Sequence, residues 1–557
     1  IISFPKFLRL KSSVLLLIGR IVIKLCMKMP SNMNHKFSEV PQAQIERSAF
    51  DRSHSYKTMF NPDYLIPFYC DEVLPGDTFN VDTVNFIRMS SPLNVPIMDN
   101  MYLDTFYFFV PLRLLWTNFQ KFMGEQVNPA DSTSFVVPTV TATPGTGWVA
   151  ESLADYMGIP TGITPLPVAA FHFRAYNLIW NQWFRDQNLQ NSVTVNTGNG
   201  PDAASDYPLL KRNKRHDYFT SCLPWAQKGT AVNIPLGTVA PVKGLGVCLP
   251  PGISPLYNVY ETAGGGPFIW DKAWESSQAS APFYMKSEPL LGAHFPAVYA
   301  DLTGATAATI NSLRQAFQIQ KLYERDARGG TRYTEIVKSH FGVTSPDARL
   351  QRPEFLGGRS TPILISTVPQ TSAAAGQPTP QGHLSAFALG TNARDGFTKS
   401  FTEHGVVLGL CMVRADLTYQ QGLDRMWSRS TRFDYYFPAL AHLGEQAVLN
   451  KEIYAQGTSA DDTVFGYQER FAEYRYATSK ITGKLRSTYA TPLDVWHLAQ
   501  EFGALPTLSS AFITETMPIT RIEAVTTEPA FVMDSFIKCR AVRPMPTYSV
   551  PGLIDHF

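Results

Sequence analysis

The chain has 557 residues, of which 44% are hydrophobic, 12% aromatic and only 17% charged, which is the composition of a globular protein. Its 41 prolines and 37 glycines favour strands joined by long, turn-rich loops over a helical protein. The formal net charge of +2 gives no argument for nucleic-acid binding by the whole protein, so such a site needs a local basic patch.

Residues 1–32 carry six basic side chains and no acidic one. Without those six, 42 basic residues remain against 46 acidic ones, so the rest of the chain has a net charge of −4. The apolar stretch Ser12–Gly19 is shorter than the roughly 20 residues that cross a bilayer. Because methionines follow at positions 27, 29 and 33, we interpret residues 1–32 as an upstream extension outside the mature fold. A membrane anchor or signal peptide is the alternative.

The chain then alternates between polar and strand-forming segments. Residues 33–60 are mostly polar and predict an extended amino-terminal arm. Segments rich in aromatic and β-branched residues predict strands at Tyr64–Cys70, Phe79–Met89, Met101–Val110, Gly405–Arg414 and Phe531–Val542. Strands early and late in a chain that pair across a long middle are typical of a jelly roll. No repeat of 20–50 residues is visible, which disfavours solenoids and propellers.

Helical and loop segments fill the middle of the chain. A helical period predicts helices within Leu112–Gln126, Phe171–Gln187, Asn311–Ala327 and Thr331–Phe341. Gly229–Ala300 is rich in glycine and proline and lacks a period, so it is predicted to be a loop. Thr361–Gly396 is also predicted to be loop-like, with TSAAAGQPTPQG at its centre.

Motifs for catalysis or metal binding are absent. The sequence contains no GxSxG, HExxH or GxxxxGK[ST] motif. Its six cysteines form no CxxC pair, which argues against a zinc knuckle or a disulfide framework. Asp461 and Asp462 with Glu469 do not have the ligand spacing of an EF-hand, so a solvated acidic turn is the better interpretation. We therefore expect no catalytic residue, no metal and no cofactor.

A basic run stands out in LLKRNKRHDYFTSCLPWAQKG, residues 209–229. Its cationic side chains are Lys211, Arg212, Lys214, Arg215 and His216. Cations neutralise phosphates and aromatic rings stack on unpaired bases, so the run suits a nucleic-acid contact. A contact with a neighbouring subunit and a plain solvated loop remain the alternatives.

A second segment, GLDRMWSRSTRFDYYFP, alternates arginines with aromatic residues between 422 and 438. Enrichment in arginine and aromatic residues is typical of buried protein–protein contacts. The candidate subunit-interface residues are Arg425, Trp427, Arg429, Arg432, Tyr435 and Tyr436. A plain folding core is the alternative interpretation.

Long blocks of the chain resemble the major capsid proteins of gokushoviruses, small single-stranded DNA phages of the Microviridae. The blocks include FSEVPQAQIERSAFDRSHSYKTMFNPDYLIPFYCDEVLPGDTF, ERDARGGTRYTEIVKSHFGVTSPDARLQRPEFLGG, TYQQGLDRMWSRSTRFDYYFPALAHLGEQAVLNKEIYAQG and RPMPTYSVPGLIDHF, and the basic run belongs to another. The resemblance extends from Phe37 to Phe557 but is weak in residues 231–300, and residues 1–32 have no counterpart in the family.

The resemblance implies a mainly β fold, an eight-stranded antiparallel jelly roll with long loop insertions containing short helices, built from residues 61–557 as one domain. It implies a structural protein, not an enzyme, that self-assembles into the smallest (T=1) class of icosahedral capsid. Residues 229–300 would then be the variable surface protrusion, with Gly264, Gly265 and Gly266 in a host-facing loop.

The partners implied by the resemblance are other copies of the chain, packaged single-stranded DNA and a host surface receptor. Related capsid proteins also assemble with an internal scaffolding protein, a pilot protein and a small basic DNA-binding protein. The expected location is the virion, after assembly in the bacterial host cytoplasm. Two rival functions remain. A jelly-roll carbohydrate-binding or glycoside-processing protein would need two converging carboxylates, and a single-stranded-DNA-binding protein would need a continuous basic groove.

Overall fold

A computed structural model of the chain describes residues 45–142, 144–229, 242–243, 299–300, 310–330, 332–343, 351–372, 376 and 379–548. Residues 51–541 form one compact unit, and residues 1–50 with 542–557 form a second. The predicted extension at residues 1–32, most of the predicted protrusion and Gly264–Gly266 lie outside the described residues. Those three interpretations therefore stay predictions.

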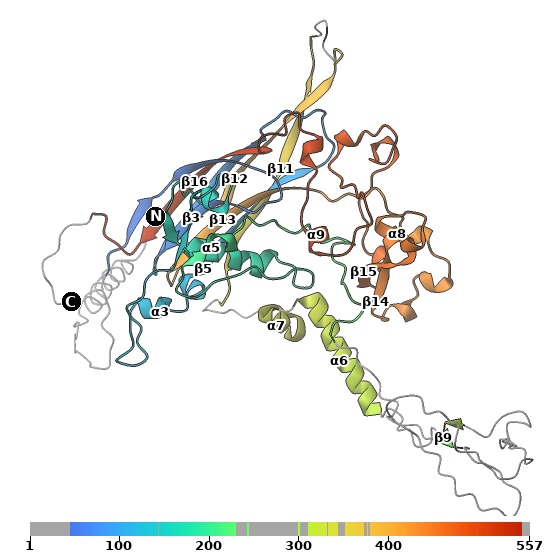
Figure 1. Ribbon diagram of the computed structural model, residues 1–557, viewed down its shortest axis with the longest axis horizontal. Coiled ribbons are helices and arrows are strands. Elements are labelled where there is room, and N and C mark those ends of the chain that lie inside the picture. The colour runs from blue at the N-terminus through green and yellow to red at the C-terminus, as the bar shows by residue number, and fades with distance from the viewer. Residues whose placement is uncertain are drawn as a thin grey trace, which may run out of the picture. The chain divides into compact units, whose positions relative to one another are not determined.

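The larger unit contains a curled antiparallel sheet (Figure 1). Its strands are β2 (His54–Phe60), β3 (Ile66–Val73), β4 (Thr78–Met89), β5 (Met101–Pro111), β11 (Glu354–Pro369), β12 (Leu384–Ser400), β13 (Gly405–Ala415) and β16 (Phe531–Arg543). The order is β16-β4-β12-β11-β5-β13-β3, and β2 pairs with β16. Strands from the two ends of the sequence are thus neighbours, and the predicted mainly β, jelly-roll fold is confirmed.

The sequence pattern of each strand follows from what covers its two faces. Along β4, buried residues such as Val81 and Ile87 alternate with exposed ones such as Phe86, because one face is turned inward and the other to solvent. Along β13 every residue is buried. This strand lies between β3 and β5 and is covered on both faces, which explains its continuous apolar run GVVLGLCMV.

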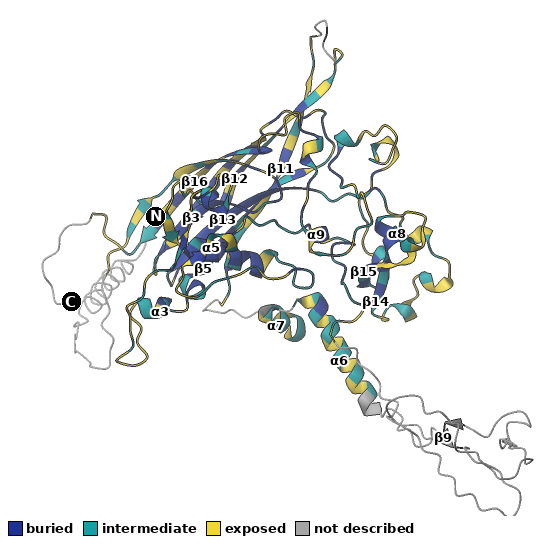
Figure 2. Ribbon diagram, viewed as in Figure 1, coloured by how far each residue is buried: buried dark blue, intermediate teal, exposed yellow. Residues whose placement is uncertain are grey.

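Two hydrophobic cores meet at β13. Val407 and Val413 belong to the core inside the curled sheet, whereas Leu408 and Met412 belong to a core between the sheet and the helical segment that follows β5. Figure 2 shows this buried layer running through the central strands and into α5 (Phe171–Ile179). The second core holds the helical insertion rigidly against the sheet.

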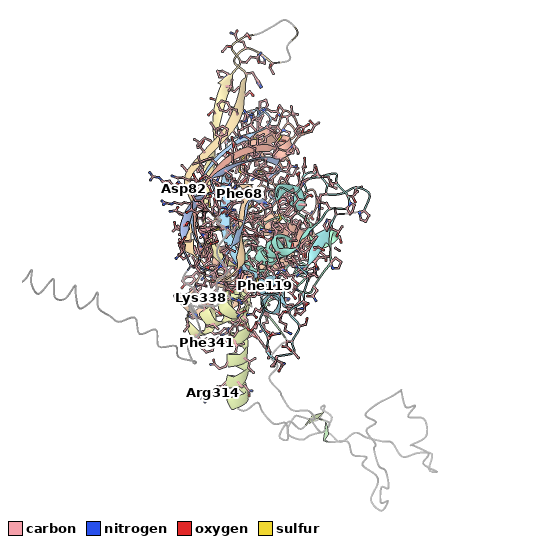
Figure 3. The ribbon with its side chains drawn as sticks, turned by 90° about the vertical axis from the view of Figure 1, so that its left-hand side faces the viewer. Phe68, Asp82, Phe119, Arg314, Lys338 and Phe341 are labelled. Carbon is pink, nitrogen blue, oxygen red and sulfur yellow. The ribbon has the colours of Figure 1, made fainter. Side chains whose placement is uncertain are left out.

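The predicted helices are present, in shorter pieces at the amino-terminal end. Leu112–Gln126 contains two four-residue helices, α2 (Leu112–Leu115) and α3 (Phe119–Phe122). α5 continues into a π-helical turn at Trp180–Phe184, and α6 (Ile310–Gly329) and α7 (Tyr333–Phe341) match the two predicted later helices. Phe341, which ends α7, is 75% exposed (Figure 3).

The remaining described elements are short. They are β1 (Ser48–Asp51), β6 (Thr139–Thr141), α4 (Leu153–Tyr156), β7 (Pro167–Ala169), β8 (Asp202–Ala203), β9 (Val242–Lys243), β10 (Tyr299–Ala300), β14 (Glu445–Leu449), α8 (Asn450–Ile453), β15 (Val464–Glu469) and α9 (Ser510–Ile513), with several single 3₁₀ turns. Within the described residues, no helix combines the length and hydropathy needed to cross a membrane.

One sequence prediction is wrong. The loop predicted at Thr361–Gly396 consists largely of β11 and β12, which pair with each other. The loop-like centre TSAAAGQPTPQG was extended over residues that form strands. Gly396 does not break β12, because a side chain there would collide with the Val81 carbonyl oxygen, and the glycine allows the two backbones to approach closely. Only the central segment is a connection, closed by a 2.8 Å hydrogen bond from the Gln370 amide to the His383 carbonyl oxygen.

The end of the predicted amino-terminal arm is a strand of the sheet. His54–Phe60 is β2, which pairs with β16 in antiparallel register. Phe60 at its end is fully buried and contacts Phe531 with 6.1 Å between ring centroids.

Candidate nucleic-acid and subunit contact surfaces

The basic run is held against the sheet by bridges on both sides. Lys211 pairs with Tyr64, and Asn213 pairs with Thr514, each through an isolated antiparallel bridge. The Lys211 ammonium lies 3.6 Å from the Asp63 carboxylate and 4.9 Å from the centroid of the Tyr64 ring. The run is therefore an extended, fixed segment and not a free loop.

Arg212 is bound inside the subunit. Its Nη1 donates to Asp104 Oδ2 over 2.9 Å, and Arg414 Nε donates to the same oxygen over 2.8 Å. The Arg212 guanidinium also lies over the ring of Phe106, 4.9 Å from its centroid. Two arginines thus share one buried carboxylate, and Arg414 also lies 3.4 Å from the Asp416 carboxylate.

Lys214 is likewise directed inward. It is 7% exposed, its Nζ donates to Gln500 Oε1 over 2.7 Å, and the ammonium lies 4.8 Å from the Phe512 ring centroid. Burial lowers the pKa of Lys214, and the nearby Glu515 opposes that shift. Of the five cations in the run, only Arg215 and His216 are exposed.

The aromatic residues after the run pack inside the subunit. Tyr218 and Phe219 are buried in a third core with Phe465. The Tyr218 hydroxyl donates to Glu452 Oε2 over 2.8 Å, and Phe219 meets the Tyr419 ring at 4.8 Å between centroids. These rings are therefore not free to stack on a base.

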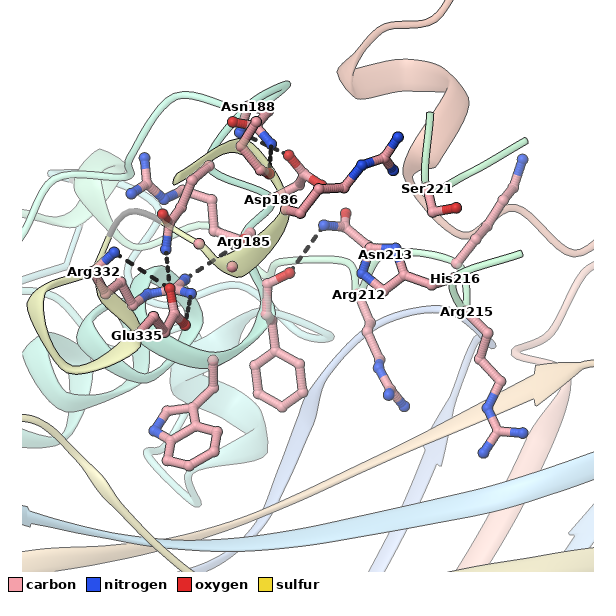
Figure 4. A pocket seen from close by; sticks show the side chains of 18 of the residues that line it. Arg185, Asp186, Asn188, Arg212, Asn213, Arg215, His216, Ser221, Arg332 and Glu335 are labelled. Carbon is pink, nitrogen blue, oxygen red and sulfur yellow. Dashed lines mark hydrogen bonds and ion pairs between the residues drawn. The ribbon is translucent and has the colours of Figure 1, made fainter. Parts of the chain in front are cut away.

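The run forms one side of a cavity of about 790 Å³, which we call the basic cavity (Figure 4). Its other sides come from β5, the segment after α5, the start of β11 and the α6–α7 connection. The lining cations are Arg185, Arg212, Lys214, Arg215, Arg328 and Arg332, and the lining acids are Asp186 and Glu335. Arg212 is paired with Asp104 and Arg328 with Glu445, both behind the lining, so six cations against four carboxylates leave the cavity a net charge of +2 in a chain whose body is weakly acidic.

Arg185 and Arg332 concentrate charge on the wall opposite the run. Arg332 Nη1 donates to Glu335 Oε1 over 2.8 Å, and its Nη2 donates to the Arg185 carbonyl oxygen over 3.2 Å. The Nε atoms of both arginines are buried without a hydrogen-bond acceptor. Burial and, secondly, the charge of Arg332 lower the pKa of Arg185. An anion bound in the cavity beside them would balance this positive charge.

Aromatic rings line the cavity beside these cations. Trp183 and Phe355 are 37% and 42% exposed, and their ring centroids lie 5.8 Å apart. Trp183 is fixed by a 3.0 Å hydrogen bond from Nε1 to the Pro353 carbonyl oxygen. Phe108 supports both rings from below, at 5.6 Å from Trp183 and 5.5 Å from Phe355. The rings are therefore held in place and present accessible faces.

Only the basic run, one side of this cavity, could be recognised in the sequence. Arg185, Arg328 and Arg332 were not recognised, because they stand outside the run in the sequence and reach the cavity only through the fold. The available signal was weak: Trp183 lies within the aromatic helical segment Phe171–Gln187, but nothing in that segment indicated an exposed ring.

The Arg/aromatic segment at 422–438 forms a second surface, beside β14, β15 and α8. Arg425 Nη1 donates to the Ala447 carbonyl oxygen over 2.7 Å and to Glu452 over 3.0 Å. Arg429 donates to Glu473 over 3.3 Å and lies over the Tyr435 ring, 5.3 Å from its centroid. These two arginines bind within the subunit and fix the loop.

The aromatic residues of this second surface face outward. We define the aromatic surface as Met426, Trp427, Phe433, Tyr435, Tyr436, Phe437, Tyr474 and Tyr476, each 47–71% exposed. Arg432 lies over the Phe433 ring, 4.8 Å from its centroid. Tyr436 meets Tyr474 with 6.3 Å between centroids. Exposed apolar groups that gather in this way mark an interaction site.

Comparison with known proteins identifies the chain's family. Residues 38–553 match the family described as Capsid protein (F protein). The chain belongs to this family. It is similar to Capsid protein VP1 of Bdellovibrio phage phiMH2K, with 48% identity across 95% of this chain and 100% of the relative. It is also similar to Capsid protein VP1 of Chlamydia phage 1, with 43% identity across 94% and 99%.

A third relative, Capsid protein VP1 of Spiroplasma virus 4, is 37% identical across 93% of this capsid protein and 97% of the relative. The gokushovirus resemblance is thus confirmed, and the role of this capsid protein is structural. The relatives are named as capsid proteins, which supports a structural role over the glycoside-processing rival. Among the described residues, no group of three His, Cys, Asp or Glu side chains could hold a metal ion.

Proposed function

We propose that copies of this capsid protein join through the aromatic surface to close an icosahedral shell around single-stranded DNA. The observation that carries the proposal is the exposure of that surface. Trp427 alone is 71% exposed, although a tryptophan is normally covered in a protein that stays a monomer.

The arginines below the aromatic surface support an interface between copies. Arg425 and Arg429 are held by Glu452 and Glu473, so the rings around them are presented on a fixed frame. Tryptophan, tyrosine and arginine are the residues that contribute most to protein–protein contacts when a partner buries them. A rigid surface of this composition loses little side-chain entropy on association.

Enclosure of DNA requires positive charge that faces the genome. The body of the chain has a net charge of −4, so general attraction to DNA cannot supply it. The basic cavity, with a net charge of +2 after the partners of Arg212 and Arg328 are counted, is the local exception. We propose that it faces the interior, with Arg215 and His216 as the exposed members of the basic run and Lys211, Arg212 and Lys214 as its internal support.

The remaining parts of the proposal follow the family resemblance. Residues 229–300 form the host-facing protrusion that meets a surface receptor. An internal scaffolding protein, a pilot protein and a small basic DNA-binding protein assemble with the shell in the bacterial host cytoplasm. Gly264–Gly266 belong to the protrusion loop.

The direct test is assembly of the full chain, alone and together with its scaffolding protein, followed by light scattering and electron microscopy. Uniform closed particles are the expected result. A species that remains monomeric even with the scaffolding protein would contradict the proposal. A monomer that still bound DNA tightly would favour the single-stranded-DNA-binding rival instead.

A further inference from the structure

The basic cavity combines two features that one ligand class requires together. Its size of about 790 Å³ falls within the range of roughly 300–1,000 Å³ that is usual for small-molecule sites. One wall offers guanidinium groups, and the adjoining wall offers the accessible faces of Trp183 and Phe355. Guanidinium groups recognise phosphate, and flat aromatic faces stack on unpaired bases.

We infer that the basic cavity binds a nucleotide of the enclosed single strand, with its base against the Trp183 and Phe355 pair, one phosphate at Arg185 and Arg332, and the next phosphate of the strand at Arg215 on the opposite wall. This inference rests on the proposed function, because it takes the cavity to face the packaged DNA. It adds a specific mode of binding: an unpaired base enters the subunit, and the contact is not limited to backbone phosphates on a charged surface.

The phosphate contacts rest on guanidinium groups without an ion-pair partner in the described part of the chain. Arg185 Nη1 has one long hydrogen bond, 3.4 Å to the Gln190 carbonyl oxygen. The Arg215 side chain is exposed and forms no hydrogen bond or ion pair with the described residues, and only its backbone carbonyl accepts a hydrogen bond, from Thr220. Arg332 is paired with Glu335 and adds positive charge beside Arg185. Phosphate oxygens accept from guanidinium donors and would supply the partners that Arg185 and Arg215 lack.

The base side of the cavity is built on a fixed cluster of tilted aromatic rings. Trp183 is anchored at Nε1, and Phe108 in contact with it is 1% exposed. Arg352 lies over the Trp183 ring, 5.0 Å from the centroid, and adds positive charge beside the cluster. An acidic protein segment would neutralise the cations but would leave both rings without a planar partner. For this reason a nucleotide fits the site better than a neighbouring subunit's carboxylates.

The test uses the full chain as unassembled subunits and a fluorescently labelled thymidine octamer, with binding followed by anisotropy. The variants are Arg185→Gln and Arg215→Gln. The matched control is Arg88→Gln, which removes one exposed positive charge from the outer face of β4. We expect each cavity variant to weaken octamer binding at least fivefold and to reduce the salt dependence by about 0.7 of a log unit per log unit of salt. The Arg88→Gln control should bind as the unaltered chain does.

A second probe isolates base stacking. An abasic octamer of the same length keeps every phosphate but offers no ring, so we expect it to bind about tenfold more weakly. Trp183→Phe, which keeps a ring but removes the indole, should abolish the octamer-induced quenching of tryptophan fluorescence. Equal binding of the two octamers would overturn the base-binding inference.

Three other results would also overturn the inference, and each has its own meaning. Equal weakening by Arg88→Gln would show general attraction to charge. Displacement of the octamer by an equal concentration of octaglutamate would show a site for an acidic protein segment. If Arg185→Gln fails to fold, unchanged octamer binding by the exposed Arg215→Gln variant would by itself overturn the inference. Closed shells of the unaltered chain, seen by electron microscopy, separate these outcomes from failure of the proposed function, in which no shells form.

Discussion

Arg212 and Asp104 form a largely buried ion pair, with 2.9 Å between Nη1 and Oδ2, although Arg212 stands in the middle of the most basic run in the sequence. Arg414 binds the same carboxylate from the other side. A cation that looks available in the sequence is therefore part of the internal structure, and its exposed neighbour Arg215 is not.

The two neighbouring arginines give a matched pair of stability measurements. Arg212→Ala removes a charge-assisted hydrogen bond and exposes a polar cluster, so we expect the free energy of unfolding to fall by about 1.5–3 kcal/mol. Arg215→Ala should change it by less than about 0.5 kcal/mol, because the side chain is at the surface. Thermal and urea unfolding of the unassembled subunit measure both. Equal losses for the two variants would refute the internal role of Arg212.

Arg174 and Asp202 form the most deeply buried ion pair of the helical insertion. Two hydrogen bonds of 2.7 Å join them, and their side chains are 0% and 3% exposed. Removing one partner leaves the other charge buried and unpaired, so we expect Arg174→Met to cost about 3–5 kcal/mol of unfolding free energy.

The control for Arg174 is Lys57, whose ammonium lies 3.4 Å from Asp534 on the exposed face of the sheet. An exposed pair contributes about 0–1 kcal/mol, so Lys57→Met should leave the unfolding midpoint almost unchanged. If Lys57→Met lowered the free energy of unfolding as much as Arg174→Met does, burial would not be what makes the Arg174–Asp202 pair important for stability.

Glu515 makes the stability of the subunit depend on pH. Burial and, secondly, the charge of Asp63 raise the pKa of Glu515 from 4.5 to about 7, against the opposing charges of Lys214, Arg414 and Arg212. The folded state therefore holds a proton that the unfolded chain has lost. The resulting stability is full below about pH 4.5, falls as the pH rises towards 7 and then stays constant.

Glu515→Gln tests this pH dependence. The amide cannot ionise, so the variant should lose less unfolding free energy between pH 5 and pH 8 than the unaltered chain does. Urea unfolding at both pH values gives the difference directly. Glu523 provides a comparison, because burial also raises its pKa to about 7 at a separate place. Parallel pH curves for Glu515→Gln and the unaltered chain would show that Glu515 does not ionise in this range.

The strands with a clear pattern could be predicted from the sequence, and those shaped by backbone contact could not. The alternation in Phe79–Met89 and the apolar run in Gly405–Arg414 report directly on one or two buried faces. In β12 the same reasoning fails, because Gly396 permits a close approach to β4 and Arg394 has a φ of +60° at an irregularity in the pairing. Local composition cannot distinguish such a glycine from one in a turn.

The two candidate sites also differ in how far they could be predicted from the sequence. The aromatic surface lies mostly within one continuous segment, so Trp427, Tyr435 and Tyr436 could be named from the sequence, and they are exposed in the structure. The basic cavity combines segments that are far apart in the chain. The sequence pointed to the basic run, but which cations remain available depends on distant carboxylates such as Asp104, which only the fold reveals.

Whether copies of the chain join through the aromatic surface is decided by the assembly of Trp427→Ala, followed by light scattering and compared with that of Phe387→Ala. Trp427 is in the aromatic surface, whereas Phe387 is a ring on β12 that is 48% exposed and lies outside that surface. Loss of an interface tryptophan commonly costs 2 kcal/mol or more per contact, on the order of a thirtyfold weaker association. We expect closed particles for Phe387→Ala and dispersed subunits for Trp427→Ala, each with an unchanged unfolding midpoint. Normal particles from Trp427→Ala would contradict it.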